Sequence, residues 1–236
     1  MTRILLALAV LVLLLPSGRA EKPRRFSDET LSYSVNWPSG LSLGEGRLVT
    51  RQVKGTSAAG DRWEFEFTLE AAIPGFQVID HHRALASAVL CSIELEKEAT
   101  HGKRKTSERT VFEPQRGVAS RQTLGGGGKS EMEIPECPRD ALTFLHHVRR
   151  ELASGRVPPP QTIYFGAPYT VHFEYGGRQS LRVGAAQVEA DRLVASIRGK
   201  ASDVTVELFF ALDETRQPVL VRVPMALGTF SLELVR

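Results

Sequence analysis

The chain has 236 residues, of which 42% are hydrophobic and 24% are charged, with a formal net charge of +3 and two cysteines. These values lie near the globular average, so they exclude a disordered, collagen-like or disulfide-scaffold chain. The length suits one large domain or two small ones. The positive charge raises the question of a polyanionic partner, and the answer depends on where the basic residues lie.

The first twenty residues are typical of an export signal. An arginine precedes an unbroken apolar run from Ile4 to Leu15, which is shorter than the about 20 residues that a membrane-spanning helix needs. Gly18 and Ala20 place small residues at the two positions that a signal peptidase reads. We therefore predict that residues 1–20 form a signal peptide, cleaved between Ala20 and Glu21. The alternative is an uncleaved membrane anchor.

The remaining chain, residues 21–236, is predicted to be a single β-rich domain, exported to the periplasm or secreted, with no membrane span. Cleavage would remove two basic residues and leave 28 basic and 27 acidic ones, a net charge of +1. Such a chain has no overall field that attracts polyanions. The basic run Lys103–Lys105 lies close to several glutamates, so we expect a solvated turn there and no nucleic-acid partner.

The two cysteines, Cys91 and Cys137, are predicted to form a disulfide, because an exported chain meets an oxidising environment. Closing the loop of 45 intervening residues would stabilise the fold by about 4 kcal/mol on the chain-entropy model. The bridge would tie the predicted helix to the sheet. The alternative is two buried free thiols. Metal ligation is not favoured, because the chain lacks a C-x-x-C spacing.

Most of the chain after residue 28 alternates between apolar and polar residues with a period of two. This pattern predicts antiparallel strands with one solvated face. The clearest runs are Leu31 to Trp37, Trp63 to Leu69, Ile93 to Leu95, Val204 to Phe210 and Phe230 to Leu234. Turn signals lie at Pro38 to Gly40, His101-Gly102, Pro114 to Gly117, Gly125 to Gly128, Gly176-Gly177 and Asp213 to Pro218. We predict about ten to twelve strands.

One segment, about residues 138–153, is predicted to be a helix. Pro138 can occupy a first turn, and Asp140 suits the positive end of the helix dipole. Apolar residues recur at three- and four-residue spacing, and Gly155 can end the helix with a positive φ. The predicted fold is therefore mainly β. It is one curved antiparallel sheet, as an open barrel or sandwich, with a single central helix. Two β lobes joined by the helix are the alternative.

Motifs for catalysis or cofactor binding are weak. The run Gly125 to Ser130 resembles a phosphate-binding loop, but Thr123 stands where that motif needs glycine and a strand pattern follows in place of a helix. We interpret the run as a hairpin turn. The adjacent histidines of each pair, His81-His82 and His146-His147, point in different directions on a strand or helix.

We therefore predict no catalytic residue, no metal site and no cofactor. An enzyme remains the alternative if at least two of six chemistry-bearing residues converge in one cleft. Those residues are Asp80, His81, His82, His146, His147 and Glu151.

Aromatic residues suggest a different kind of site. A curved sheet can enclose a groove for an apolar ligand, because wide barrels leave space that side chains do not fill. An ordinary hydrophobic core is the alternative interpretation of the same residues. The candidates for the groove are Trp37, Trp63, Phe65, Phe67 and Phe210.

Three stretches resemble a family of exported bacterial proteins, domain of unknown function 3108. They are Leu31-Ser32-Tyr33-Ser34-Val35-Asn36-Trp37 with Gly40 to Gly46, Asp140-Ala141-Leu142 with Phe144-Leu145 and Arg149, and Leu208-Phe209-Phe210 with Asp213, Arg216 to Val219 and Gly228. The resemblance covers roughly residues 28 to 235. The chain departs from the family pattern in its cysteine pair and in His146-His147. The resemblance implies a β-rich periplasmic protein and names no catalytic residue.

The leading hypothesis is a non-enzymatic periplasmic protein that binds an apolar envelope ligand, such as a lipid, or an envelope protein partner through its curved sheet. A structural or interaction module without a ligand cavity is the first alternative. A hydrolase or metal-dependent enzyme that uses the His, Asp and Glu groups is the second.

Overall fold

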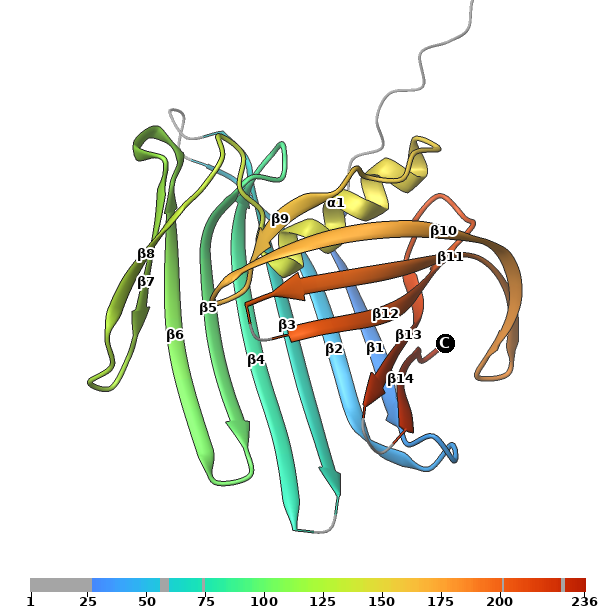
Figure 1. Cartoon of the computed structure of the whole chain (residues 1–236). Helices are drawn as coiled ribbons and strands as arrows, with labels where there is room; N and C mark the ends of the chain where they lie inside the picture. Colours follow the sequence, from blue (N-terminus) through green and yellow to red (C-terminus); the bar gives the residue numbers. More distant parts are fainter. Residues whose placement is uncertain (1–26, 56–59, 74, 201, 226–227) are drawn as a thin grey trace, which may run out of the picture.

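A computed structural model describes residues 27–55, 60–73, 75–200, 202–225 and 228–236 (Figure 1). The predicted signal peptide and its Ala20-Glu21 cleavage site lie outside the described residues. No helix in the described ranges is long and apolar enough to cross a membrane. The elements are β1 (Glu29–Asn36), β2 (Ser42–Val53), β3 (Arg62–Ile73), β4 (Phe76–Ser87), β5 (Ser92–His101), β6 (Arg104–Glu113), a 3₁₀ turn (Pro114–Arg116), β7 (Val118–Thr123), β8 (Lys129–Glu133), α1 (Ala141–Ala153), β9 (Gln161–Tyr164), β10 (Pro168–Val183), β11 (Ala186–Gly199), β12 (Ser202–Ala211), β13 (Pro218–Met225) and β14 (Gly228–Leu234).

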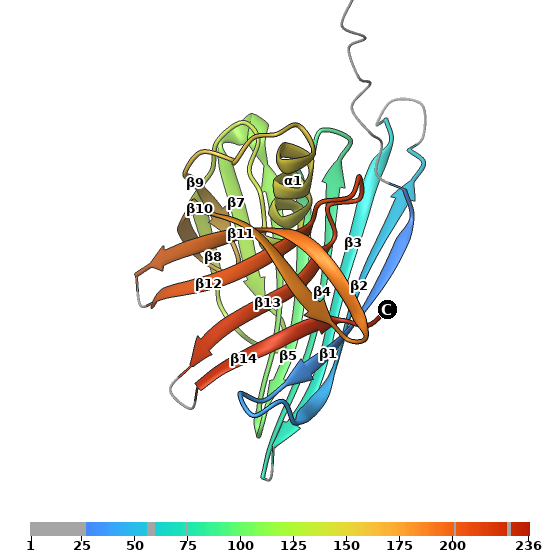
Figure 2. The same cartoon turned by 90° about the vertical axis from the view of Figure 1, so that its right-hand side faces the viewer.

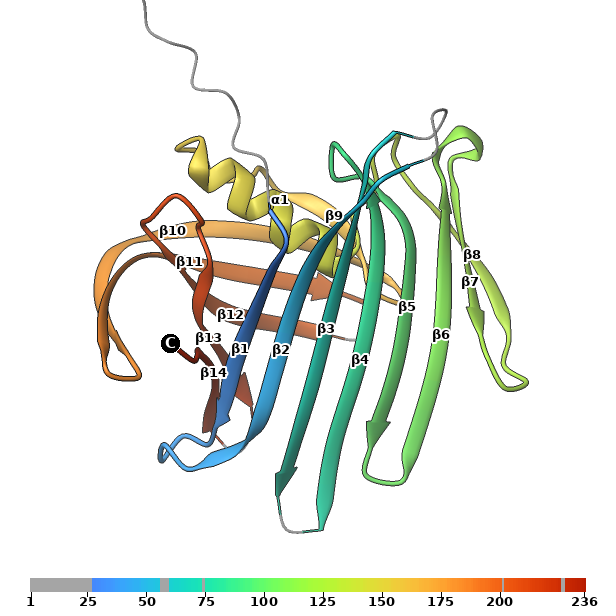
Figure 3. The same cartoon turned by 180° about the vertical axis from the view of Figure 1, so that it is seen from behind.

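All these strands belong to one antiparallel sheet of 14 strands, in the order β8 to β1 and then β14 to β9. The chain builds the first half outward from β1, crosses over through α1, and builds the second half back until β14 pairs with β1, where Tyr33 faces Leu234. Figures 1 and 3 show a strongly curved sheet, in which β1–β8 form one wall and β9–β14 cross it. The predicted curved, open antiparallel sheet with one helix is therefore confirmed.

The predicted strand number, ten to twelve, is too low for the described part of the chain, which has eight strands before α1 and six after it. The turn predicted at Gly176-Gly177 is wrong. It is a bulge inside β10, where the pairing with β11 shifts register between Tyr175 and Arg178. The chain reverses direction at Gly184 instead, with a φ of 59° that favours glycine.

The sheet is also buried on both faces in one region, which corrects the expectation of one-sided strands. Phe209 and Phe210 are neighbours in β12 and so point to opposite faces, yet both are 0% exposed. They belong to two different hydrophobic clusters. Beside them, β10 and β11 bend sharply, and their hairpin curls back toward the C-terminal end of the chain (Figures 1 and 2).

The helix begins at Ala141, three residues later than predicted, because Asp140 is its N-cap. The Asp140 carboxylate accepts hydrogen bonds from the backbone N–H groups of Leu142 and Thr143, at 2.8 and 3.0 Å, which satisfies donors that a helix start leaves unpaired. At the other end, Gly155 adopts the expected positive φ. The Arg156 N–H then bonds the Glu151 carbonyl, which closes the helix with a Schellman motif.

The helix lies between the two walls near one end of the sheet (Figure 2). Phe144 stacks on Phe173 of β10, with ring centroids 5.7 Å apart. On the other side, His146 stacks on Phe65 of β3 at 3.9 Å. Because α1 contributes buried residues to both hydrophobic clusters, it packs against both walls.

A disulfide joins Cys91 to Cys137, as predicted, over a sequence separation of 46 residues. It links the β4–β5 turn to the segment that precedes α1. The hydroxyl of Ser92, next to Cys91, donates to the Asp140 carboxylate at 2.5 Å and accepts the Asp140 N–H at 2.7 Å. The disulfide and the helix cap therefore hold the same junction between the helix and the sheet.

We expect Cys91→Ser to lower the free energy of unfolding by about 2–4 kcal/mol without abolishing the fold, because a core of this size is stable without a cross-link. Urea unfolding followed by circular dichroism measures the effect. Reduction of the parent protein should reproduce it, and reduction of the variant should change nothing. A variant that matched the unreduced parent would contradict the assigned role.

Candidate functional site

The inner face of β3–β6 is the face that meets α1, and its side chains form rows across the strands. The row nearest the helix joins Phe65, Ala84, Leu95 and Thr110, which are directly opposite one another in the sheet. These four residues are between 0% and 2% exposed. This first row is therefore fully packed core.

The second row, here called the inner row, consists of Phe67, His82, Lys97 and Glu108. It lies one step farther from the helix along the same strands. The character of the inward positions changes here, because three of the four residues are polar or charged. Lys97 and Glu108 keep 19% and 15% of their side-chain surface exposed, and their charged atoms are 3.7 Å apart.

A turn from the opposite wall covers the inner row. Phe165, in the β9–β10 turn, places its ring 4.0 Å from the Lys97 ammonium group and meets His82 edge-on at 4.9 Å. The next residue, Gly166, has a φ of 80° and approaches so closely that a Cβ there would lie 3.0 Å from Glu108 Oε2. Side-chain contacts thus connect the two walls where no strand pairing does.

The pKa values of His82, Lys97 and Glu108 are all lowered from their ordinary values, for different reasons. Burial lowers the pKa of His82 to about 4, although the nearby Asp80 charge opposes the shift. Burial also lowers the pKa of Lys97, and Glu108 counteracts it. For Glu108, burial would raise the pKa, but hydrogen bonds from Arg121 and the Lys97 charge outweigh it and lower the pKa. At neutral pH, the row therefore holds a neutral imidazole beside a paired cation.

The third row continues outward with Leu69, Asp80, Ala99 and Thr106. All four are partly exposed. The Asp80 carboxylate lies within hydrogen-bond distance of His101 Nε2, at 2.8 Å. His101 keeps 49% of its side chain exposed. The inner face thus changes from closed to open over two steps of the strands.

A second polar cluster, here called the helix clamp, lies on the inner side of β1 and β2. The Arg149 side chain is 2% exposed and forms a two-pronged ion pair with Glu29. It also donates to the Thr215 carbonyl at 2.8 Å and contacts His146 Nδ1 at 3.3 Å. The other His146 nitrogen lies 3.4 Å from the Thr50 hydroxyl.

The helix clamp connects α1 with three distant parts of the chain. Burial, followed by the Arg149 charge, keeps the pKa of His146 well below its ordinary value. Burial raises the pKa of the neighbouring Tyr33 phenol, which donates to the Pro218 carbonyl at 2.9 Å. All the strong donors and acceptors here face one another, so the geometry favours a structural role over a catalytic one.

The five predicted groove aromatics do not gather in one place. Trp63 and Phe65 are buried in one cluster with Phe67 against it, and Phe210 belongs to the other cluster. Trp37 packs edge-on against Phe230 near the end of β1. Of the five, Phe67 is the one that lies at the boundary between the packed core and the open inner face.

Of the six residues of the enzyme alternative, Asp80 and His82 lie on one face of the sheet and the other four lie elsewhere. His81 is on the outer face and pairs with Glu66 at 3.0 Å. His147 contacts Arg150, and Glu151 pairs with Arg156. Asp80 and His82 share the inner face of β4. Among the described residues, no group of three or more His, Cys, Asp or Glu side chains is arranged to hold a metal ion.

Three residues that matter here were not singled out from the sequence, namely Glu29, Lys97 and Arg121. Their contacts join segments far apart in the chain, as in the pair of Glu29 with Arg149 across 120 positions. The period of two could have identified Lys97, because it places Lys97 on the same face as Leu95. A charged residue at an inward position was the available signal.

A family model described as "Protein of unknown function (DUF3108)" matches residues 32–235. The chain belongs to the DUF3108 family. The DUF3108 chain is also similar to the crystal structure of a β-barrel-like protein of domain of unknown function DUF1849 from Brucella abortus. The TM-score is 0.61 and the sequence identity 9%, over 90% of this chain and 98% of that one. At such identity the likeness shows the fold alone. No curated protein matches the chain.

The stability of this DUF3108 protein should fall as the pH drops from 6.5 toward 4. Within that window the unfolded state binds a proton at His82, whose ordinary pKa is 6.5, but the folded state does not until about pH 4. His82→Leu should therefore remove on the order of 2 kcal/mol of this fall. Urea unfolding at pH 7.0 and 4.5 measures it, with His172→Gln, at an exposed site, as the control. If the free energy of unfolding fell equally between pH 7.0 and 4.5 in His82→Leu and in the parent, the lowered pKa of His82 would be contradicted.

Arg149→Met should destabilise the DUF3108 protein by about 3 kcal/mol, because it leaves the Glu29 carboxylate without its buried partner. The double variant Glu29→Gln with Arg149→Met should cost less than the sum of the two single variants. Arg109→Met, which breaks an exposed pair with Glu94, is the control and should unfold like the parent. If the double variant lost as much unfolding free energy as the two single variants together, Glu29 and Arg149 of the helix clamp would not be energetically coupled.

Proposed function

We propose that this protein is an exported, non-enzymatic protein of the cell envelope that binds an amphipathic ligand on the open part of its inner face. The observation that carries the proposal is the change along β3, β4 and β5. Along β3, inward residues are fully buried at Phe65 and partly exposed from Phe67 outward, and on β4 the partly exposed positions begin at Asp80, because His82 is 8% exposed. A curved face that is open and partly apolar suits a ligand.

The chemistry of this face defines the ligand class. Phe67, Leu69 and Val78 offer apolar surface on neighbouring strands, which suits an acyl chain or another elongated apolar body. The Asp80–His101 pair lies beside that surface. It suits a polar head that accepts or donates hydrogen bonds. A lipid-like molecule combines both properties.

Two features support export to the periplasm. The first twenty residues have the apolar run and the small residues of a cleavable signal. The Cys91–Cys137 disulfide fits an oxidising compartment. A carrier or sensor of envelope lipids would operate in that compartment, where free lipids need protein surfaces that exclude water from their chains.

The arrangement of ionisable groups supports binding over catalysis. The buried His146 and Arg149 are engaged with Thr50, Glu29 and a backbone carbonyl, and these contacts stabilise α1. On the inner face, Glu108 is paired with Arg121 and Lys97. A general base needs a free lone pair and access to substrate, and these groups use theirs on each other.

The proposal predicts that blocking the third row abolishes ligand binding. Ala99→Trp places an indole on the open inner face between Asp80 and Thr106, and we expect at least a tenfold loss of affinity for a fluorescent fatty acid. Thr100→Trp adds the same side chain on the outer face of the same strand and should bind like the parent. Titration of probe fluorescence at constant protein concentration measures both.

Native mass spectrometry of protein purified from the periplasm provides the second part of the test. We expect a co-purifying lipid on the parent and on Thr100→Trp, and none on Ala99→Trp. No co-purifying lipid and no uptake of the probe by the parent protein would overturn the proposal. Such a result would favour the alternative of an interaction module without a ligand.

A further inference from the structure

The end of the molecule farthest from α1 is formed by hairpin tips. Figure 1 shows the β1–β2, β5–β6 and β7–β8 connections at that end, here called the rim, together with the adjoining ends of β3, β4, β13 and β14. Four of these tips carry a large hydrophobic residue with much of its surface in water. They are Leu41 at 67% exposed, Phe76 at 45%, Leu124 at 47% and Met225 at 62%.

The rim is also basic. The described tip segments 37–43, 72–73, 75–77, 101–106, 123–129, 224–225 and 228–229 contain Lys103, Arg104, Lys105 and Lys129 and no aspartate or glutamate. In the whole chain, by contrast, 30 basic residues are balanced by 27 acidic ones. Charge of one sign is therefore concentrated at the same end as the exposed apolar side chains.

These basic side chains differ from those on the outer face of the sheet. There, arginines alternate with glutamates in cross-strand pairs, such as Arg83 with Glu64 at 2.5 Å and Arg109 with Glu94 at 2.7 Å. Within the described part of the chain, none of the four rim lysines and arginines forms an ion pair. Their charge is therefore available to an external anion, whereas the outer face neutralises its own.

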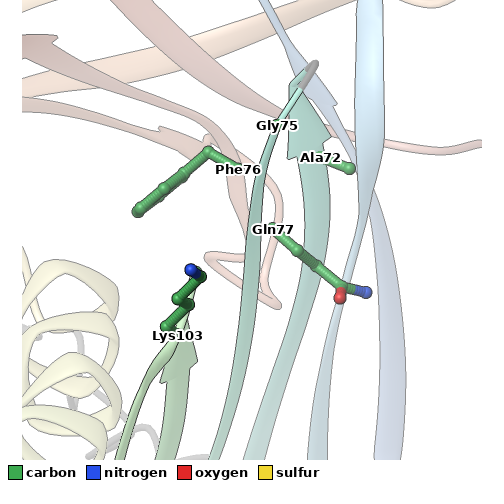
Figure 4. A pocket seen from close by; sticks show the side chains of 6 residues that line it. Ala72, Gly75, Phe76, Gln77 and Lys103 are labelled. Carbon is green, nitrogen blue, oxygen red and sulfur yellow. The ribbon is translucent and has the colours of Figure 1, made fainter.

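Two tips form the centre of the rim. The Phe76 ring of the β3–β4 tip lies against Gly102 of the β5–β6 tip, 3.0 Å from the position that a Cβ would take there. A shallow hollow of about 600 Å³ opens beside them. Figure 4 shows Phe76 and Lys103 on one side of the hairpin, with Ala72 and Gln77 on the other. An exposed aromatic ring thus stands next to an unpaired ammonium group.

We propose that the rim docks the protein on the surface of an anionic lipid bilayer. Exposed apolar residues at loop tips gain free energy when they enter the headgroup region, and lysine or arginine beside them attracts anionic lipids. The rim combines both features on separate hairpins at the same end of the molecule. This inference goes beyond ligand binding, because it concerns a different surface and holds whether or not the inner face carries a ligand.

Docking would also set the orientation of the inner face. The open third row, with Leu69 and Asp80, lies on the rim side of the inner row. The closed part, with Phe65 against α1, lies on the opposite side. A bilayer at the rim would therefore face the open end of the sheet, and the helix would point away from it.

Flotation with vesicles tests the proposal. The purified protein is mixed with vesicles of phosphatidylethanolamine and phosphatidylglycerol, or with vesicles of phosphatidylcholine, at low and high salt. The variants are Phe76→Ser and the triple variant Lys103→Glu, Arg104→Glu and Lys105→Glu. Controls at the helix end are Val89→Ser and the double variant Arg116→Glu with Arg156→Glu, all at exposed positions.

We expect the parent protein and both controls to float with anionic vesicles at low salt. The affinity of the triple variant should fall roughly 100-fold and that of Phe76→Ser several-fold. Absence of binding by the parent, equal binding to both kinds of vesicle, or equal losses in the helix-end controls would overturn the proposal. Thermal unfolding verifies that each variant is folded. Uptake of the fluorescent fatty acid, which the rim variants should retain, reports separately on the inner face.

Discussion

The rest of the structure depends on how α1 is held between the two walls of the sheet. A sheet of 14 strands whose edges do not pair would expose its inner face unless something filled the curve. The helix does so, and polar contacts fix it at both ends. Asp140 caps its start and bonds Ser92, while Arg149 pairs with Glu29 near its end. Burying these charges is costly, so each is matched by partners that hold the helix in one position.

The size of the helix explains why only part of the inner face is closed. A helix is about 10 Å across and α1 runs across the strands of the first wall (Figures 1 and 3). Strands β3 and β4 have 12 residues each and rise about 3.3 Å per residue, so they extend well past it. Phe165 and Gly166 close one further step over Lys97. Beyond that step, the inward residues Leu69, Asp80, Ala99 and Thr106 are partly exposed.

Local patterns predicted the elements better than their assembly. The period of two identified the strands, and the spacing of apolar residues identified α1, because both report which side of an element is buried. These local patterns do not report which strands pair with each other or in which register. Gly176-Gly177 has the composition of a turn and is a bulge, since the register of β11 decides the outcome. Lys97 and His82 are of residue types that usually lie at the protein surface. Contact with Phe165, a residue far along the chain, makes them part of a site.

Along β3, the inner face is closed at Phe65 and partly exposed from Phe67 outward. Hydroxyl-radical footprinting of the purified protein, with and without oleate, measures this along a single strand. The account predicts slow oxidation of Phe65 in both conditions, faster oxidation of Phe67 and Leu69 in the free protein, and protection of those two residues by oleate. Equal, slow oxidation of all three residues in the free protein would contradict it, because it would mean that the core is closed along the whole strand.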